Sequence, residues 1–407
     1  MNSHSSEPVS KARILFLEQS LTHGGGARSL FYILRFLDKE RFEAFIAVPE
    51  KEGLLNTRVQ EEQLATILYE PHLRIGMTSH QVRGFLRWIK PILQMRDFIA
   101  VSFFYLPALI RKHHIALIHA NTTATRFIGT IAGWVTKVPV IWHLRNVPDG
   151  LSRVGIAFFS RWSSLKSVIA VSEHTVKLFP VPSHKKNVVY NSIDFDEFDP
   201  TRIRSMLREE YHIPLTAFVV GACGRPLPKK GYHVLITAVA EMIRQFPEKD
   251  IRCVIVGGQN SSKQQAYDAS LHAQVHSLGL TDRVIFTGFK SDVRPYVCGM
   301  DVLAVPSLWD EPFGRTALEA MALQVPVIGF RRGGIPEVIG DEGNGLIVES
   351  GDVKGLANAM IRLMNNPQER AAMAQSARRR AVTHFDAFTK TRAIEDIFKL
   401  AMQKKHV

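Results

Sequence analysis

Cysteine is scarce in this chain, and so are long apolar runs. An odd, sparse set of three thiols in 407 residues argues against a disulfide framework and predicts reduced cysteines in a reducing compartment. The longest apolar run, residues 98–110, contains Ser102 and Pro107 and falls short of the roughly 20 residues of a membrane-spanning helix. The polar residues 1–10 lack the apolar segment of a signal peptide and are expected to form a loose tail. The three cysteines are Cys223, Cys253 and Cys298.

Acidic residues are in short supply in the first half. Residues 1–195 hold 24 Lys+Arg against 14 Asp+Glu, which places +10 of the chain's net charge of +13 there. Such a surface suits an anionic lipid, a diphosphate-bearing acceptor or nucleic acid, and a merely soluble basic surface is the alternative. The chain is 46% hydrophobic and 22% charged, which is a globular composition, and its length predicts two domains.

Short apolar runs alternate with amphipathic segments in both halves, which is typical of parallel α/β sheets. We therefore predict an α/β protein with two doubly wound domains facing each other across a cleft, residues 1–195 and 196–385. A C-terminal helix, residues 386–407, is expected to pack back on the first domain. The expected strands are 13–17, 45–48, 117–119, 140–143 and 168–171 in the first half, and 218–222, 253–256, 284–286, 302–305, 327–329 and 345–348 in the second.

A polar segment, Glu311-Pro-Phe-Gly-Arg-Thr-Ala-Leu-Glu319, follows the expected strand 302–305. Gly314 allows the backbone to approach a ligand, and a helix opening near Thr316 has free N–H groups and a dipole that favour an anion. Glu319 can reach a diol such as a ribose, and Glu311 can reach sugar hydroxyls. Backbone N–H groups that can bind phosphate, flanked by two carboxylates that can bind hydroxyls, predict a nucleotide-sugar site. The alternative is that both glutamates are solvated surface residues.

A basic loop, Gly224-Arg-Pro-Leu-Pro-Lys-Lys-Gly231, follows the expected strand 218–222. Arg225 supplies a guanidinium fork and Lys230 a point charge, and together they can neutralise a diphosphate as a sugar–phosphate bond breaks. A solvated basic loop is the alternative interpretation.

These two motifs resemble the signature of retaining GT-B glycosyltransferases of family 4, the glycosyl transferases group 1. The resemblance covers nearly the whole chain and is strongest over residues 221–337. It implies the GT-B architecture of two Rossmann-like domains. It also implies transfer of a sugar from a nucleoside-diphosphate sugar with retention of configuration, without metal or other cofactor. Pro226 departs from the family, which more often has a larger apolar residue there.

The same resemblance implies roles for individual residues. His143 ends an expected strand, and Arg145 with Asn146 replaces the acidic neighbour that the family commonly has, so a sugar contact is expected rather than a general base. The alternative for His143, and for His119 at the end of the preceding expected strand, is that each side chain is simply packed there. The expected catalytic residues are Arg225, Lys230, Glu311 and His143. The expected donor-binding residues are Gly25, Gly26, Gly258, Phe289, Phe313, Gly314, Arg315 and Glu319. The acceptor side is expected to hold His119, Asn121 and Arg145, and no metal ligand is expected.

The acceptor is suggested by residues 72–112, which mix basic residues with apolar residues such as Trp88. This pattern favours a helix at a membrane surface, although an ordinary packed helix fits equally well. We therefore expect a lipid-linked or cell-surface glycan as acceptor, as in polysaccharide or lipopolysaccharide assembly. The protein is expected in the cytoplasm, peripheral on the inner face of the cytoplasmic membrane. A small soluble acceptor and a nucleotide-sugar-binding protein without turnover are the alternatives, and no nucleic-acid partner is expected.

Overall fold

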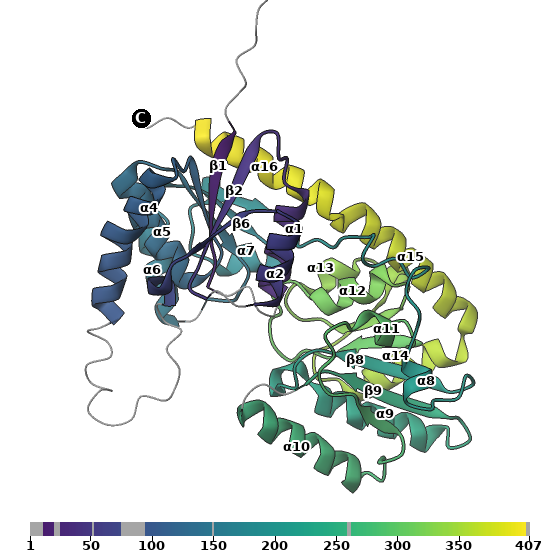
Figure 1. The fold of residues 1–407 in the computed structure, drawn as a ribbon. Coiled ribbons are helices and arrows are strands. Elements are labelled where there is room, and N and C mark those ends of the chain that lie inside the picture. Colours follow the sequence, from purple (N-terminus) through teal and green to yellow (C-terminus); the bar gives the residue numbers. More distant parts are fainter. Residues whose placement is uncertain are drawn as a thin grey trace, which may run out of the picture. The chain divides into compact units, whose positions relative to one another are not determined.

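The computed structural model describes residues 11–19, 25–50, 53–74, 94–148, 150–258 and 262–403 (Figure 1). The chain divides into two compact units. The first comprises Met1–Ser192 together with Ala387–Val407, and the second comprises Ile193–Asp386. Both divisions fall within a few residues of the predicted domain limits.

The first unit is built on a seven-stranded parallel sheet with the order β3-β2-β1-β4-β5-β6-β7. Residues Ile14 to Leu17 of β1 and all four residues of β4 are buried, because helices cover both faces of the sheet, and this explains their continuous apolar runs. The strands are β1 (Ala12–Leu17), β2 (Phe42–Val48), β3 (Thr66–Tyr69), β4 (Leu117–Ala120), β5 (Val140–Leu144), β6 (Leu165–Ala170) and β7 (Lys186–Val188). The helices of this unit include α1 (Gly25–Phe36), α2 (Leu54–Glu61), α5 (Thr123–Thr136), α6 (Gly150–Phe159), α7 (Glu173–Leu178) and α16 (Ala387–Gln403).

Two strands of this sheet, β3 and β7, were not expected from the sequence. Each lies at an edge of the sheet, and neither contains a fully buried residue. An edge strand needs only part of its surface to be apolar, so the short segments Thr-Ile-Leu-Tyr and Lys-Asn-Val lack the apolar run that marks the inner strands.

The second unit is built on a six-stranded parallel sheet with the order β10-β9-β8-β11-β12-β13. All six strands were expected, and two of them have the predicted bounds. The strands are β8 (Phe218–Cys223), β9 (Ile251–Val256), β10 (Val284–Phe286), β11 (Val302–Val305), β12 (Val327–Phe330) and β13 (Leu346–Val348). The helices are α8 (Leu207–Glu210), α9 (Tyr232–Gln245), α10 (Ser262–Ser277), α11 (Arg294–Val297), α12 (Arg315–Ala322), α13 (Ile335–Ile339), α14 (Val353–Asn365) and α15 (Pro367–Phe385).

Helix α16 packs within the first unit, against α1 and the sheet (Figure 1). Glu395 is buried on it and accepts a hydrogen bond from the Asp38 backbone N–H at 2.8 Å. Arg392 pairs with the same carboxylate at 2.5 Å. A charged group this well buried is stable only when it is paired and hydrogen-bonded, so these contacts hold the end of the chain on the first unit.

Much of the predicted amphipathic segment 72–112 lies outside the described residues, including Trp88. Its described part continues as helix from residue 94 through a π-helical stretch, Val101–Tyr105, into α4 (Leu106–Lys112). Leu106 and Ile110 are buried in the core of the first unit. Within the ranges that the structure describes, no helix is both long and apolar enough to cross a membrane.

Candidate functional site

Each sheet has one place where the strand order changes direction along the chain. It lies between β1 and β4 in the first unit and between β8 and β11 in the second. Open parallel sheets bind ligands outside the carboxyl ends of their strands at this place. Most of the predicted site residues end these strands or their neighbours, or lie in the segments that follow them.

In the second unit, the basic loop after β8 is held against the segment that follows β11. Gly231 caps α9 with φ +71°, and a Cβ added there would lie 1.9 Å from the carbonyl oxygen of Pro306. The Leu308 N–H donates to the carbonyl of Lys229 at 2.9 Å. Because both the left-handed backbone and the close approach require glycine, Gly231 positions Lys230 beside the residues that follow β11.

Lys230 and Glu311 form an ion pair across this junction. Nζ of Lys230 lies 2.5 Å from Oε1 of Glu311, and Oγ of Ser307 donates to the same oxygen at 2.8 Å. Burial raises the pKa of the Glu311 carboxyl, but the charge and hydrogen bond of Lys230, with the bond from Ser307, outweigh it and hold that pKa below its usual value. The structure therefore places Lys230, predicted to contact the diphosphate, beside the ionised carboxylate of Glu311, predicted to contact the sugar.

Arg225 lies on the same loop, and its side chain is exposed. Among the described residues it has no hydrogen-bond or ion-pair partner, so its guanidinium is available to a ligand. Lys229, which the sequence did not single out, lies with Nζ 3.5 Å from the ring centroid of Trp309. Burial, followed by the nearby charges of Lys230 and Arg225, lowers the pKa of Lys229, although Glu311 acts in the opposite direction. The loop therefore carries three positive charges close together, those of Arg225, Lys229 and Lys230.

The N-terminus of α12 lies in the same segment. Gly314 caps this helix with φ +97°. Arg315 donates through Nε to Oε1 of the buried Glu319 at 3.1 Å, one helical turn away. The side chain of Phe313 is 2% exposed and packs edge-on against Phe385 on α15. The predicted donor contact at Phe313 would therefore come from its backbone N–H, because its ring is part of the core.

The loops after β9 and β10 also meet. A Cβ at Gly258 would lie 2.5 Å from Cβ of Phe289, and the Gly257 N–H donates to the carbonyl of Gly288 at 3.1 Å. The Phe289 side chain is 55% exposed. A close backbone contact thus presents an aromatic ring at the carboxyl edge of the sheet, where it can stack on a planar group.

In the first unit, the three residues predicted for the acceptor side lie together with His143. Nδ1 of His143 lies 3.2 Å from Nε2 of His119 and 3.2 Å from Nη2 of Arg145. Arg145 also donates to Oδ1 of Asn121 at 3.3 Å and to Oδ1 of Asn191 at 3.0 Å. Burial, and then the charge of Arg145, lowers the pKa of His119 to about 3 and holds that of His143 well below its usual value. Both imidazoles are therefore neutral near pH 7.

A fully buried arginine, Arg126 on α5, supports this cluster and was missed from the sequence. It donates to the backbone carbonyls of Asn121 and His143 and to Oδ1 of Asn146, at 2.9 to 3.1 Å. Burial, and next the charge of Arg145, lowers the pKa of Arg126 to about 9, although Glu18 acts in the opposite direction. A lone charged residue in an otherwise apolar helix is the signal that could have revealed it.

Gly25 and Gly26, which the family resemblance assigned to donor binding as part of a glycine-rich loop, belong to a helix instead. Helix α1 begins at Gly25, so both glycines lie in its first turn, where backbone N–H groups have no partner within the helix. A Cβ at Gly26 would lie 3.9 Å from Cδ of Arg145. The start of α1 and the Arg145 side chain therefore adjoin, and Gly24 lies outside the described residues.

Two family models match this chain. The model described as Glycosyltransferase Family 4 matches residues 23–197, and the model described as Glycosyl transferases group 1 matches residues 204–380. Together they span the first sheet apart from β1, the whole of the second sheet, and the two groups of polar residues described above. The chain belongs to glycosyltransferase family 4.

Solved structures with the same fold include GT-B glycosyltransferases. The Anabaena protein Alr3699/HepE, determined in complex with UDP and glucose, is 27% identical, with a TM-score of 0.76 over 95% of this chain and 99% of that one. Sucrose-phosphate synthase from Thermosynechococcus elongatus is 17% identical, with a TM-score of 0.78 over 97% of this chain and all of that one, and shares the fold.

Curated relatives match over shorter stretches. D-inositol 3-phosphate glycosyltransferase of Corynebacterium kroppenstedtii is 31% identical over 222 residues, which is 54% of this chain and 49% of the relative. Lipopolysaccharide core biosynthesis mannosyltransferase LpsB of Rhizobium meliloti is 28% identical over 241 residues, 59% of this chain and 67% of that protein. The chain spans about half the length of the inositol phosphate glycosyltransferases that it matches.

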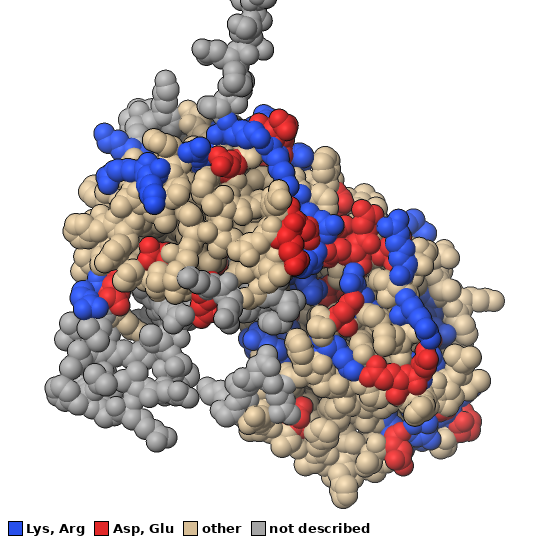
Figure 2. All heavy atoms as spheres, in the orientation of Figure 1, with Lys and Arg blue, Asp and Glu red and all other residues tan. Residues whose placement is uncertain are grey.

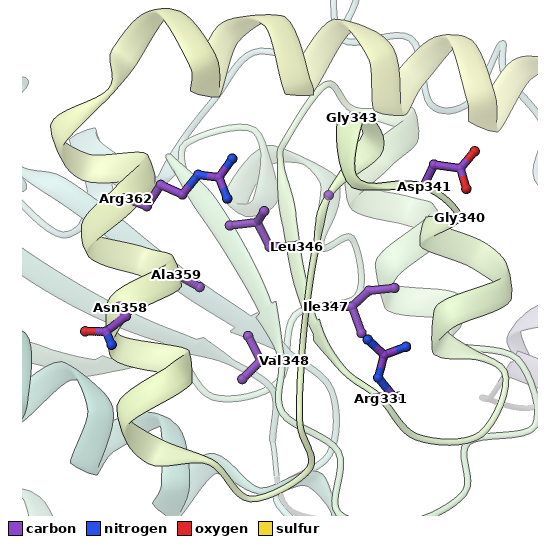
Figure 3. Close-up of a pocket in the computed structure, with 11 residues that line it drawn as sticks. Arg331, Gly340, Asp341, Gly343, Leu346, Ile347, Val348, Asn358, Ala359 and Arg362 are labelled. Carbon is purple, nitrogen blue, oxygen red and sulfur yellow. The ribbon is translucent and has the colours of Figure 1, made fainter.

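A separate cavity of about 840 Å³ lies beside β13, the edge strand of the second sheet (Figure 3). It contains none of the predicted site residues of this family 4 protein. Its two arginines are already paired, Arg331 with Glu349 at 2.7 Å and Arg362 with Glu369 at 2.6 Å. The cavity therefore offers no uncompensated positive charge to a nucleotide diphosphate.

Proposed function

We propose that this protein transfers a sugar from a nucleoside-diphosphate sugar to an acceptor, with retention of the anomeric configuration. The observation that carries the proposal is the Lys230–Glu311 pair, at the same end of the strands as the exposed Arg225, between β8 and β11, where the strand order changes direction. The solved complexes of Alr3699/HepE with UDP and with UDP-glucose support a uridine nucleotide-sugar as the first donor to test.

In the proposed reaction, the diphosphate approaches Arg225, Lys230 and the N-terminus of α12. Their charges and N–H groups stabilise the negative charge that grows on the leaving phosphate. Glu311 accepts hydrogen bonds from sugar hydroxyls, and Glu319 from a ribose diol. The bond from the anomeric carbon to the phosphate oxygen breaks, the acceptor oxygen bonds to that carbon on the same face, and the acceptor proton passes to the departing phosphate.

No metal or other cofactor is part of this proposal. A divalent cation serves many nucleotide sites as a clamp on the phosphates. Here Arg225 and Lys230 would supply the two positive charges, and α12 would supply backbone donors, so the reaction would proceed with the nucleotide-sugar alone.

The proposed acceptor is a lipid-linked glycan at the inner face of the cytoplasmic membrane. Helices α4, α5 and α6 contact one another in sequence and bury Ile110, Ile128 and Ile156 in one core cluster. Their other sides are unusually apolar for a surface, and in Figure 2 the region over them is mostly uncharged. The exposed apolar side chains of residues 94–162 are Met95, Ile99, Phe103, Phe104, Tyr105, Trp134, Val154 and Phe158.

The charges of this face favour an anionic bilayer. The exposed Lys and Arg side chains of residues 98–162 are Arg111, Lys112, Lys137, Arg153 and Arg161, and Asp149 is the one acidic residue in that part of the sequence. Aromatic side chains with basic neighbours are typical of proteins that lie in the interfacial layer of a membrane. This face replaces the predicted segment around Trp88 as the support for a lipid acceptor.

A small phosphorylated acceptor is the second candidate, because the relatives from Corynebacterium are named for D-inositol 3-phosphate. Binding of nucleotide-sugars without turnover is the third. A panel of nucleotide-sugars, screened for thermal stabilisation and for hydrolysis, tests the donor. Stabilisation without hydrolysis or transfer to any glycan, lipid-linked or soluble, would leave only the binding function, and the absence of both responses would refute the proposal.

A further inference from the structure

We propose that Arg145 is a positioning residue that fixes His143 and His119 as neutral imidazoles with their protons on Nε2. His143 then acts only as a hydrogen-bond donor, through Nε2–H, toward an oxygen of the bound substrate. The hydrogen-bond directions around the two rings lead to this conclusion, and its functional part rests on the proposed sugar transfer.

The hydrogen bond between Arg145 and His143 can run in only one direction. A guanidinium has N–H donors and no acceptor. Nη2 of Arg145 lies 3.2 Å from Nδ1 of His143, so this nitrogen must accept. A neutral imidazole that accepts at Nδ1 carries its proton on Nε2. Arg145 thereby selects one of the two tautomers of His143.

The contact between His143 and His119 fixes the tautomer of His119 as well. Its Nε2 lies 3.2 Å from the Nδ1 of His143 that has just been assigned as an acceptor. Nε2 of His119 must therefore be the donor, and its proton is fixed there too. Nδ1 of His143 accepts from both neighbours, which leaves no lone pair with which it could take a proton from a substrate.

Some buried polar atoms of this cluster have no hydrogen-bond partner. Nε2 of His143, Nδ2 of Asn121 and Nδ1 of His119 are buried and have no hydrogen-bond partner among the described residues. Under this assignment the first two atoms are donors, and Nδ1 of His119 is an acceptor. A buried donor without a partner costs roughly 1–3 kcal/mol, which an oxygen atom of a ligand or a water would recover. The cluster therefore favours a ligand that presents acceptor atoms, such as hydroxyl, ring or phosphate oxygens.

The surrounding groups keep the rings neutral. Arg145 at the end of β5 and Arg126 on α5 are cationic neighbours of His143, while Glu18 after β1 is the acidic group near this cluster. From α16, the aromatic ring of Phe398 faces His119 at a centroid distance of 5.6 Å. Protonating either ring would add a third positive charge to a buried site with two, so burial and repulsion act in the same direction.

Arg145 is itself anchored at its other nitrogens. Nε donates to Asn121 and Nη1 to Asn191, so the guanidinium plane is held from two sides while Nη2 faces the imidazole. Lysine cannot reproduce this fork, because its ammonium is a single point on a flexible stem. Charge alone and geometry can therefore be separated by substitution.

The test is long-range ¹H–¹⁵N correlation NMR of the full chain labelled with ¹⁵N-histidine, recorded from pH 5 to pH 8. His119→Gln and His143→Gln assign the two resonances among the 16 histidines. In the wild type, both rings are expected to be neutral Nε2–H tautomers throughout. Arg145→Gln is expected to release His143 into a mixture of tautomers and to raise its pKa. Arg145→Lys is expected to keep the pKa low while losing the single tautomer.

Arg153→Gln is the matched control, because this arginine is exposed in the same unit and lies outside the cluster. A wild-type His143 that is charged at pH 7 or protonated on Nδ1 would overturn the proposal without any variant. An unchanged His143 signal in a folded Arg145→Gln variant would do the same. Neither spectrum depends on turnover, so failure here is distinguishable from failure of the proposed transferase activity.

Discussion

The two units gather polar side chains at the same topological place but balance them differently. In the second unit two cations have carboxylate partners, Lys230 with Glu311 and Arg315 with Glu319. In the first unit, Arg145 donates to three neutral acceptors, His143, Asn121 and Asn191. A balanced ion pair can exchange its partner for a charged ligand, whereas a neutral donor cluster can select acceptor atoms without changing its own charge. We infer that the second unit stabilises the negative charge of the donor's diphosphate, and that the first unit donates hydrogen bonds to hydroxyl oxygens of the substrate.

The largest expected effect comes from removing the cations of the second unit. Arg225→Ala and Lys230→Ala are each expected to lower turnover at saturating donor by roughly 10²–10³-fold, because each removes a charged donor from the developing negative charge. Initial rates with the nucleotide-sugar found in the screen, and UDP affinity by calorimetry, measure the loss.

Lys229→Ala is the matched control for both variants, since Lys229 lies on the same loop but packs over Trp309. It is expected to retain most of the activity. Lys230→Ala also leaves the mostly buried Glu311 carboxylate without its partner and should lower stability by roughly 1–3 kcal/mol, whereas Arg225→Ala should not, because that side chain is exposed. Near-normal rates in both alanine variants would contradict the assignment of charge handling to this unit.

The sequence predicted the inner strands well because their apolar runs have few other interpretations. Strand 302–305, inside the second sheet, and strand 284–286, at its edge, have the observed bounds, whereas the edge strands β3 and β7 of the first sheet were missed because they lack a buried apolar run. Lys230 and Glu311 lie 81 residues apart, so spacing could not pair them; the family resemblance placed them in one site. The contacts that decide the tautomer of His143 come from three segments, and no local pattern encodes them.

A second difference between the units is tested with vesicles. Phe104→Ser and Phe158→Ser are each expected to weaken binding to vesicles containing phosphatidylglycerol by roughly tenfold, because each removes an exposed aromatic from the proposed interfacial face of the first unit. Co-sedimentation at low salt measures this, and added salt should weaken wild-type binding through screening.

Leu215→Ser is the control, since Leu215 is 89% exposed but lies in the second unit. It should leave the partition unchanged. Wild-type protein that stays in the supernatant with both anionic and neutral vesicles would remove the support for a lipid-linked acceptor. Self-association that disappears in Phe158→Ser would instead assign this face to a second copy of the chain.

A smaller effect should appear in the pH dependence of stability. The pKa of Glu311 in the folded protein lies below its ordinary value of 4.5, so this group stabilises the fold above the unfolded pKa. That contribution is lost as pH falls through the folded pKa, and a tenfold difference between the folded and unfolded acid dissociation constants corresponds to about 1.4 kcal/mol. Thermal midpoints of the wild type should therefore fall more steeply below about pH 4.5 than those of Glu311→Gln. Glu349→Gln, at an exposed pair with Arg331, should follow the wild type; equal slopes in all three proteins would show that the Lys230–Glu311 pair is not linked to folding.

Removal of divalent metal ions is expected to have no effect on the transfer rate. If Arg225, Lys230 and the N-terminus of α12 supply all the positive charge that the diphosphate needs, excess EDTA should leave the transfer rate unchanged, and added Mg²⁺ should not rescue either alanine variant. A metal-requiring site would behave differently on both counts, because a divalent cation would carry the charge on the phosphates and the arginine would only position them. Strict dependence on Mg²⁺ or Mn²⁺ would mean that the carboxylates of the second unit serve the metal rather than the sugar. The Lys230–Glu311 pair would then have to open to admit a cation, and the charge-handling role would pass from Lys230 to Glu311.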